Sequence, residues 1–213
     1  MALTVESDSI THGERVPDEH AFGVSDGEGG AAPEGGNRSP HLRWSGAPEG
    51  TQSFAIVVVD PDVPADASDA NQAGKTIPED AERTDFAHWL VVDIPADVTE
   101  IPEGAGSEEV VIGGKQPGET SFGGVAGVNT FTDFLEGDPD MGGTYGHYDG
   151  PFPPFNDERL HHYHFAVYAL DVPSLGLEGG FKLDDVRAAL EGHVLEQGEL
   201  VGEYSLHERW LQS

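Results

Sequence analysis

Two short runs of the chain are continuously apolar and rich in Val, and they constrain its fold more than any other feature. They are FAIVVV at residues 54–59 and WLVV at residues 89–92. A strand with one face in water alternates polar and apolar side chains, whereas a run that is apolar throughout is typical of a strand covered on both faces. Both runs are far too short to span a bilayer. The sequence therefore predicts a sheet with two central, doubly covered strands.

The rest of the chain is divided into short segments by 29 Gly and 15 Pro residues, a pattern that indicates a β-rich domain with long loops. The expected strands cover residues 42–44, 53–60, 86–94, 110–112, 163–171 and 200–206. One helix is expected from apolar residues that recur at spacings of three and four, namely Leu183, Val186, Leu190 and Val194.

No internal repeat and no linker between two cores is recognisable, so we predict one domain over residues 1–213. Two loops, at residues 61–84 and 113–155, are long for a compact domain, and loops of that length are usually functional or disordered. The acidic stretch near residues 65–85 is expected to form a loop insertion at the surface.

The chain carries 40 acidic residues against 10 Lys plus Arg, a formal net charge of -30. Phosphate backbones and anionic lipids attract a cationic face, so no nucleic-acid binding and no stable membrane insertion are expected. The chain has no Cys, which excludes disulfides, thiolate metal sites and a cysteine nucleophile.

The acid excess also bears on habitat and location. Molar salt shortens the Debye length to roughly 3 Å and screens self-repulsion, so this composition indicates a halophile with a salt-filled cytoplasm. An acidic face for a basic partner is the alternative. The first ten residues, MALTVESDSI, have neither a basic region nor an apolar core, so we expect a cytoplasmic protein.

Three segments place polar groups beside the expected strands. Asp60 and Asp62 follow the most apolar strand, where Pro61 and Pro64 restrict the backbone; a polar turn is the alternative interpretation. His88 enters the second apolar strand, and a buried histidine bound by a backbone carbonyl is the alternative there.

The third segment begins with a loop at residues 145–154 that is rich in Gly and Pro. Such a loop is rigid, and its backbone N–H groups can face a ligand. We therefore expect this loop to supply hydrogen-bond donors to a site.

The third segment continues into a strand that contains three histidines. Alternate residues of a strand share a face, so His161 and Tyr163 point one way, and His162 and His164 the other. One metal cage built from all three histidines is therefore not expected. Two histidines with one of the two aspartates stay an alternative metal site.

The order of these motifs resembles the phosphatidylethanolamine-binding proteins, most closely the bacterial and archaeal Raf kinase inhibitor-like branch. The strings that carry the resemblance are SPHLRW at 39–44, FAIVVVDPDVP at 54–64, HWLVVDIP at 88–95, the paired prolines at 153–154 and HHYHFAVYALD at 161–171. The resemblance covers roughly residues 3–206. It implies a mostly β, sandwich-like fold with one or two peripheral helices. At one end it implies a small pocket for phosphate or a phosphorylated head group, without a metal or cofactor.

By position in these motifs, the resemblance assigns ligand-binding roles to Asp60, Asp62, Pro64, His88, Pro153, Pro154, His161 and Tyr163. The chain departs from the family pattern at Phe155-Asn156, where Lys-Gly or similar is usual, and at His162, where Arg is common. The loop after Asp62 is also longer. With fewer cations beside the pocket, a lower affinity for doubly charged phosphate is expected.

Paired carboxylates fit an anion site if they accept hydrogen bonds from the histidines. A neighbouring carboxylate raises the pKa of a histidine and favours its cationic, anion-binding form. A zwitterion such as phosphoethanolamine would place its anion on the histidines and its ammonium on the aspartates. We predict that Asp60→Ala or His161→Ala abolishes phospho-ligand binding without unfolding the protein.

We predict a non-catalytic binding protein. The resemblance further implies regulation of a partner protein such as a kinase or protease, and a homodimer. Two alternatives stay open: a metal-independent hydrolase that uses the Asp/His pocket, and a partner-binding protein whose pocket is vestigial. Catalysis is the less favoured interpretation because the three segments offer no serine or cysteine nucleophile.

Overall fold

The computed structural model describes residues 2–211 and is built around one large antiparallel sheet. In spatial order this sheet contains β11 (Val194–Tyr204), β10 (His161–Leu170), β5 (Ser53–Pro64), β6 (Arg83–Pro95), β9 (Val125–Ala126) and β8 (Gly118–Glu119). A second sheet contains β1 (Thr4–Glu6), β4 (Leu42–Ser45) and β7 (Glu100–Ile101), and β2 (Val24–Ser25) pairs with β3 (Ala31–Ala32). Residue 1 and residues 212–213 of the predicted domain lie outside the described part.

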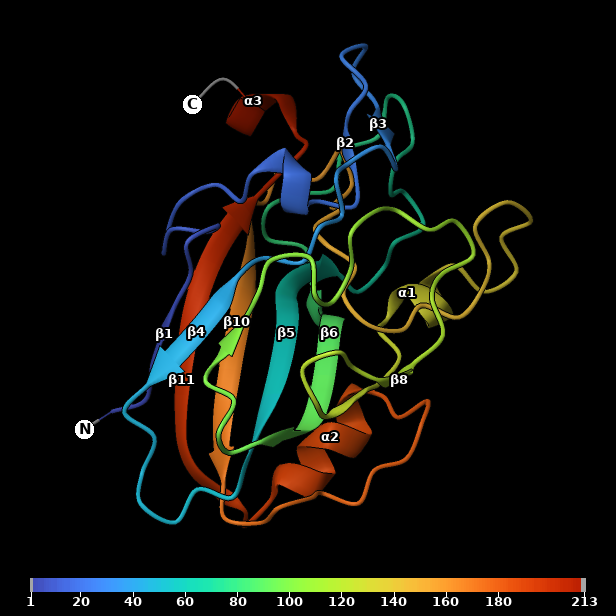
Figure 1. Cartoon of the computed structure of the whole chain (residues 1–213). Helices are drawn as coiled ribbons and strands as arrows, with labels where there is room; N and C mark the ends of the chain where they lie inside the picture. Colours follow the sequence, from blue (N-terminus) through green and yellow to red (C-terminus); the bar gives the residue numbers. More distant parts are fainter. Residues whose placement is uncertain (1, 212–213) are drawn as a thin grey trace.

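The helices are short and lie around the sheets (Figure 1). They are the 3-10 turn η1 (Asp18–His20), α1 (Phe131–Phe134), α2 (Leu183–Leu190) and α3 (Glu208–Leu211). Among residues 2–211, no helix combines the length and apolar character needed to cross a bilayer. The mostly β fold with few peripheral helices is therefore confirmed, and α1 and α3 are additional single turns.

The two central strands are buried on both faces, as their continuous apolar runs predict. Phe54, Ile56 and Val58 of β5 point into the core shared with the smaller sheet. The alternate side chains, Ala55 and Val57, pack on the other face in a cluster with α2. Burial of an aliphatic side chain of this size contributes about 1.5–3 kcal/mol, so the strands are fixed by layers on both sides.

Two details of the predicted elements are wrong. Residues 110–112 form no strand: they lie in an irregular segment before a turn, and Ile112 is 51% exposed, because no neighbouring strand pairs with this segment. The predicted helix ends at Leu190 rather than Val194, since Gly192 adopts a left-handed φ of 80° and reverses the chain. Val194 begins β11 instead.

Strand β11 also begins earlier than predicted, at Val194 rather than residue 200. Its interior glycines weaken the sequence signal for a strand, but the packing requires them. A Cβ on Gly198 would lie 2.4 Å from the carbonyl oxygen of Leu3, and one on Gly202 would lie 2.5 Å from a methyl of Val16. The N-terminal segment therefore crosses this strand only because both positions lack a side chain.

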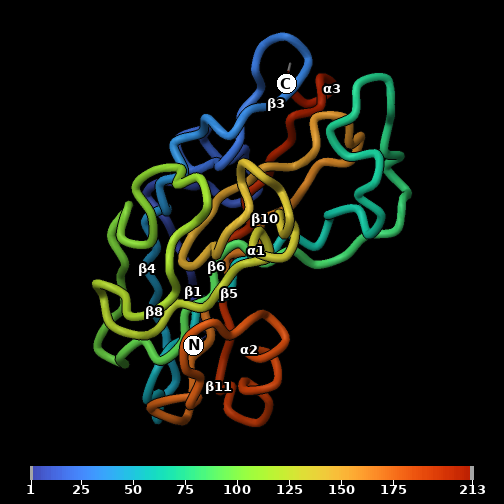
Figure 2. The backbone as a smooth tube through the Cα atoms, turned by 90° about the vertical axis from the view of Figure 1, so that its right-hand side faces the viewer, coloured from blue at the N-terminus to red at the C-terminus, as the bar shows by residue number. Residues whose placement is uncertain are grey.

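The acidic connection between β5 and β6 covers residues 65–82, because both strands extend further than predicted. Figure 2 shows this segment in teal and green, standing out at the upper right of the fold. The side chain of Asn156 holds it: the amide donates to the carbonyls of Asp69 and Lys75, and its oxygen accepts the N–H of Asn71. The longer loop and the departure from the family pattern at Asn156 therefore belong together.

The long connections gather at one end of the sheets, opposite α2 (Figure 1). The end of β5 and the starts of β6 and β10 meet at this end. The polar motifs of the sequence, which lie on these strand ends and on the following loops, are thereby brought to one region of the molecule.

Candidate functional site

A cavity of about 390 Å³ lies where the ends of β5, β6 and β10 meet the loops. Six of the eight predicted site residues line it, from segments far apart in the sequence: Asp60, Pro64, His88, Pro153, Pro154 and Tyr163. The other two predicted residues, Asp62 and His161, are buried outside this lining. The structure therefore brings most of the predicted set to one cavity and places two members behind its wall.

The separation of Asp60 from Asp62 comes from an irregularity in β5. In a regular strand these residues, two apart, would share a face. Asp60 pairs with Phe86, but Val63 pairs with Thr84, so three steps on β5 oppose two on β6. This bulge turns the following side chains to the other face. Asp60 consequently faces the cavity and Asp62 does not.

Asp60 is tied to the buried side of the wall. Its Oδ1 accepts the backbone N–H of Asp62 at 2.8 Å, and its Oδ2 lies 2.7 Å from Nδ1 of His161. Burial raises the pKa of Tyr163, and the charge of the Asp60 carboxylate and a hydrogen bond to it raise this pKa further. Asp60 is 1% exposed, so these internal partners compensate most of its desolvation.

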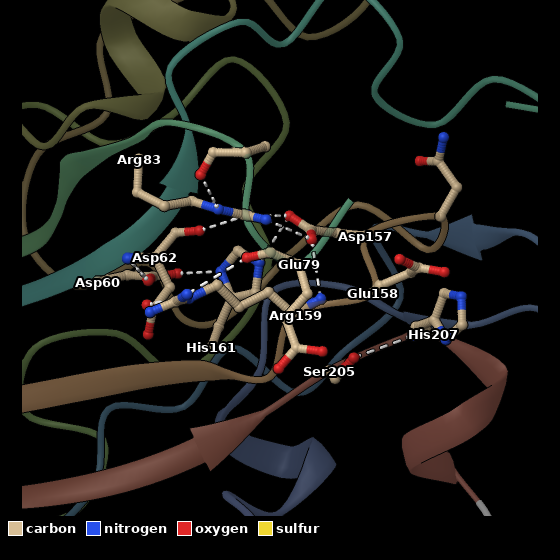
Figure 3. Close-up of polar contacts among 12 residues, drawn as sticks. Asp60, Asp62, Glu79, Arg83, Asp157, Glu158, Arg159, His161, Ser205 and His207 are labelled. Atoms are coloured by element: carbon tan, nitrogen blue, oxygen red, sulfur yellow. Dashed lines mark hydrogen bonds and ion pairs between the residues drawn. The ribbon is translucent and has the colours of Figure 1, made fainter. Parts of the chain in front are cut away.

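His161 is a buried cation between two carboxylates (Figure 3). Its Nδ1 donates to Asp60, and its Nε2 donates to Asp157 at 3.2 Å. Burial alone would lower the pKa of His161, but the charges and hydrogen bonds of Asp60 and Asp157 raise it to about 9. Arg83 completes the row by donating to both oxygens of Asp157, at 2.5 and 3.1 Å. Both ring nitrogens of His161 are thus engaged inside the protein.

Asp62 holds a second, more exposed group of charges. It accepts from Nε of Arg159 at 2.6 Å and from Nδ1 of His162 at 2.8 Å, and these hydrogen bonds lower its pKa despite its burial. His162 and His164 are partly exposed, whereas His161 and Tyr163 are buried. The predicted alternation of faces along β10 is therefore confirmed.

His88 contrasts with His161. Its Nδ1 lies 2.7 Å from the backbone carbonyl of Asp149, and since a carbonyl only accepts, this nitrogen carries the hydrogen. Burial lowers the pKa of His88, and the opposing attraction of Asp60 is smaller. The neutral form places the lone pair of Nε2 on the cavity side. The expectation that a neighbouring carboxylate makes this histidine cationic is wrong for His88.

The N–H groups of residues 145–150 in the Gly/Pro loop do not face a ligand as predicted. The amides of residues 145–150 all donate to groups of the protein, for example that of Asp149 to the carbonyl of His88 and that of Gly150 to the side chain of Asn37. The loop is held by the Asp149 carboxylate, which accepts from Lys115, Asn37 and Asn129. Burial raises the pKa of Asp149 although these donors oppose the shift. Residues 145–150 of the loop thus orient His88, whereas Phe152, Pro153 and Pro154 line the cavity.

All ten Lys and Arg side chains of the chain lie in the described part, and each forms an ion pair. The pairs are Arg15–Asp18, Arg38–Glu103, Arg43–Asp8, Lys75–Asp69, Arg83–Asp157, Lys115–Asp149, Arg159–Asp62, Lys182–Asp133, Arg187–Asp85 and Arg209–Glu79. None of the ten lines the cavity. Arg83 and Arg159 stand behind the site, but both are paired with carboxylates and neither lines the cavity, which agrees with the expectation of few cations beside the pocket.

The remaining wall of the cavity is largely apolar. Phe86 of β6, Phe131 and Phe134 of α1, and Phe152 form much of it, together with Met141. The rings of Phe86 and Phe131 contact each other edge to face at 4.9 Å, whereas Phe134 is 49% exposed at the opening. The cavity thus joins a small polar end to an apolar body and an exposed aromatic rim.

The arrangement offers no ready metal cage. Among residues 2–211, no group of three or more His, Asp or Glu side chains is placed to hold a metal ion. The candidate donors Asp60, Asp62 and His161 each use their polar atoms on internal partners.

Residues that complete the site were not identified from the sequence. Arg83, Asp157, Arg159 and Asp149 are distributed over loops and strand starts, where isolated charges usually face solvent. The pattern DGP at residues 149–151 lay within the predicted loop, but nothing in it distinguishes a buried carboxylate from an exposed one. Only the tertiary contacts reveal their roles.

Comparison with known proteins shows which family this chain resembles. The family model "Phosphatidylethanolamine-binding protein" matches residues 6–205. The chain is 33% identical over 199 residues to the UPF0098 protein YbcL of Escherichia coli, covering 93% of this chain and 82% of that protein. It is 31% identical over 202 residues to a UPF0098 protein of Aquifex aeolicus, covering 95% and 88%.

A solved structure has the same fold. The crystal structure of Escherichia coli YbcL, described as a new member of the mammalian PEBP family, superposes with a TM-score of 0.67. The two chains are 31% identical, and the match covers 96% of this chain and 99% of the other. Since the family model spans nearly the whole chain, the protein belongs to the phosphatidylethanolamine-binding protein family.

Proposed function

We propose that the protein is a non-catalytic binding protein whose cavity takes a small ligand with an acidic, typically phosphorylated, head and an apolar body. The observation that carries the proposal is the convergence of Asp60, His88 and Tyr163 at one end of an otherwise aromatic cavity. Cavities of a few hundred Å³ with a few convergent polar groups are the usual form of small-molecule sites. The polar end would orient the head, and the phenylalanine wall would cover the body.

Two features support binding rather than hydrolysis. General acid–base catalysis needs a group that can take up and release a proton at the substrate. His161 has both nitrogens bound to carboxylates, and Asp60 has both oxygens bound to internal donors. Of the two histidines, His88 alone keeps a nitrogen toward the cavity, and among residues 2–211 no serine, threonine or cysteine lines it, so binding is favoured and hydrolysis is the weaker alternative.

Binding of phenyl phosphate at pH 6 in molar KCl tests the proposal by titration calorimetry. Tyr163→Phe removes the hydroxyl that is hydrogen-bonded to Asp60 at the polar end, and we expect the resulting loss of order there to weaken binding about tenfold, the typical effect of losing one hydrogen bond to a charged group. Tyr168→Phe on the same strand is the matched control, because Tyr168 does not line the cavity and should leave affinity unchanged. Equal affinities of both variants and the wild type would contradict the assigned site.

Regulation of a partner protein and assembly into a homodimer are further proposals that rest on the family resemblance. Light scattering after size-exclusion chromatography in molar KCl tests the dimer directly. A mass of one chain at all concentrations would remove the dimer from the proposal without affecting the cavity.

A further inference from the structure

The polar end of the cavity is rich in acceptors and lacks a free cation. Nδ1 of His88 donates to the carbonyl of Asp149, so Nε2 of the neutral ring is an acceptor. Asp60 is a carboxylate whose charge is compensated from behind by His161. Each Lys and Arg in the described part is held in an ion pair away from the lining, as shown above.

A dianion would therefore meet a lone pair and a carboxylate at this end. Burial of such a charge without a partner is strongly unfavourable, whereas a head that brings its own hydrogen satisfies the lone pair. A phosphate monoester has its second pKa near 6, so it carries a P–OH at mildly acidic pH and loses it above. The cavity accordingly distinguishes the two protonation states of one ligand.

We infer that the cavity binds a phosphate monoester together with one proton, held in a hydrogen bond between a phosphate oxygen and Nε2 of His88. This inference rests on the proposed function and adds the protonation state of the bound head. The proton balance is the same whether the shared hydrogen stays on the phosphate or on the imidazole. One proton is taken up from solvent when the free ligand is the dianion.

The other titratable groups around His88 do not supply this proton. On β5 and β10, Asp60 and His161 are already joined by a hydrogen bond, and Tyr163 ionises only well above pH 10. The Asp149 carboxylate is turned toward Lys115, and only its backbone carbonyl reaches His88. Asp138 lines the cavity, where backbone N–H groups of Asp140 and Met141 hold its pKa low. At pH 7–8 Tyr163 stays neutral, Asp138 stays a carboxylate, and His161, with a pKa of about 9, stays mostly protonated.

Titration calorimetry with phenyl phosphate at pH 8 in molar KCl tests the inference. Measurements in two buffers with different ionisation enthalpies give the number of protons taken up per ligand. We expect close to one proton, and an affinity that falls about tenfold per pH unit between pH 7 and 8 because binding follows proton activity. Uptake near zero with a flat pH profile would overturn the inference while leaving the proposed function intact.

His88→Gln provides the second measurement. A glutamine amide donates a hydrogen without titrating, so this variant should bind the dianion with little proton uptake and a flat pH profile above pH 7. His162→Gln is the matched control on the exposed face of β10, and it should keep the wild-type uptake. Unchanged uptake in a folded His88→Gln variant would overturn the role of His88.

Two further results distinguish a failure of the proposed function from a failure of this inference alone. If phenyl phosphate does not bind at pH 6, where the monoanion is abundant, the proposed function and this inference both fall. If phenethylammonium binds more tightly than phenyl phosphate at pH 8 without proton uptake, the cavity takes a cation, and the inference is overturned.

Discussion

The two histidines next to Asp60 are similarly buried, yet His161 is cationic and His88 is neutral. His88 is 3% exposed and His161 0%. His161 donates to two carboxylates and has its pKa raised to about 9, whereas His88 donates to a carbonyl and has its pKa lowered. Burial keeps a histidine neutral when only one carboxylate is near. Carboxylates bonded to both ring nitrogens outweigh the effect of burial and keep the histidine cationic.

The two histidines therefore have different roles: the His161 side stabilises the fold, and the His88 side faces the cavity. The His161 side is a row of alternating charges, Asp60, His161, Asp157 and Arg83, whose members satisfy one another (Figure 3). The His88 side leaves one ring nitrogen to the cavity. Contact with a ligand is therefore expected on the His88 side, and a contribution to stability on the His161 side.

The largest expected effect comes from breaking the buried row. His161→Ala leaves buried Asp60 without a cation and leaves Asp157 with Arg83 alone, and we expect it to lower the free energy of unfolding by about 3–5 kcal/mol. Denaturant unfolding in molar KCl measures this loss. This expectation replaces the sequence-based one, in which the same variant loses ligand binding but keeps its stability.

His162→Ala is the matched control for that loss. It removes the neighbouring histidine, which is half-exposed and pairs with Asp62, and exposed ion pairs contribute roughly 0–1 kcal/mol. Similar losses for the two variants would contradict the separation of a supporting interior from an exposed face on β10.

The second-largest expected effect is a pH dependence of stability that arises from His161. The pKa of His161 rises from 6.5 to about 9 on folding, so its stabilisation is complete below pH 6.5 and is lost as pH rises through 9. The shift corresponds to a loss on the order of 3 kcal/mol. Unfolding free energies at pH 6.5 and 9.5 measure it. Asp157→Asn removes one partner and should reduce this pH dependence; an unchanged dependence would assign it to another group.

Salt should screen the repulsion between surface carboxylates and leave the interactions of the buried charged row unchanged. The net charge of -30 is screened in molar salt, so the melting temperature should rise between dilute buffer and 2 M KCl. A gain of roughly 1 kcal/mol corresponds to about 2–4 °C for a chain of this size. The deficit of His161→Ala relative to wild type should be the same at both salt concentrations. A melting temperature that does not rise would count against a halophilic origin.

The smallest effect is expected at the rim of the cavity. Phe134 is 49% exposed, so Phe134→Ser should change the free energy of unfolding by no more than about 0.5 kcal/mol. It should weaken phenyl phosphate binding a few fold and leave inorganic phosphate unaffected, because only the former has an apolar body to cover. Calorimetry with both probes distinguishes these effects, and an equal loss for both would place the rim in contact with the head.

Local sequence patterns determined much of the architecture. The uninterrupted apolar runs at residues 54–59 and 89–92 predict strands with cores on both faces, because burial on one face alone leaves a polar alternation. The period of two in a strand likewise predicts that His161 and Tyr163 turn inward while His162 turns outward. The motif order also identifies six residues that line one cavity, although they come from distant segments.

Tertiary structure alone decided which charges meet and which protonation states result. A bulge in β5 turns Asp62 to a different face from Asp60; Pro61 is compatible with such an irregularity, but it does not say which carboxylate faces the cavity. Arg83 reaches Asp157 from 74 positions away in the chain, Asp157 in turn bonds to His161, and the carbonyl of Asp149 fixes the tautomer of His88. A strand face follows from spacing along the chain, but a pKa depends on burial and on every neighbouring charge, and those neighbours are assembled only by folding.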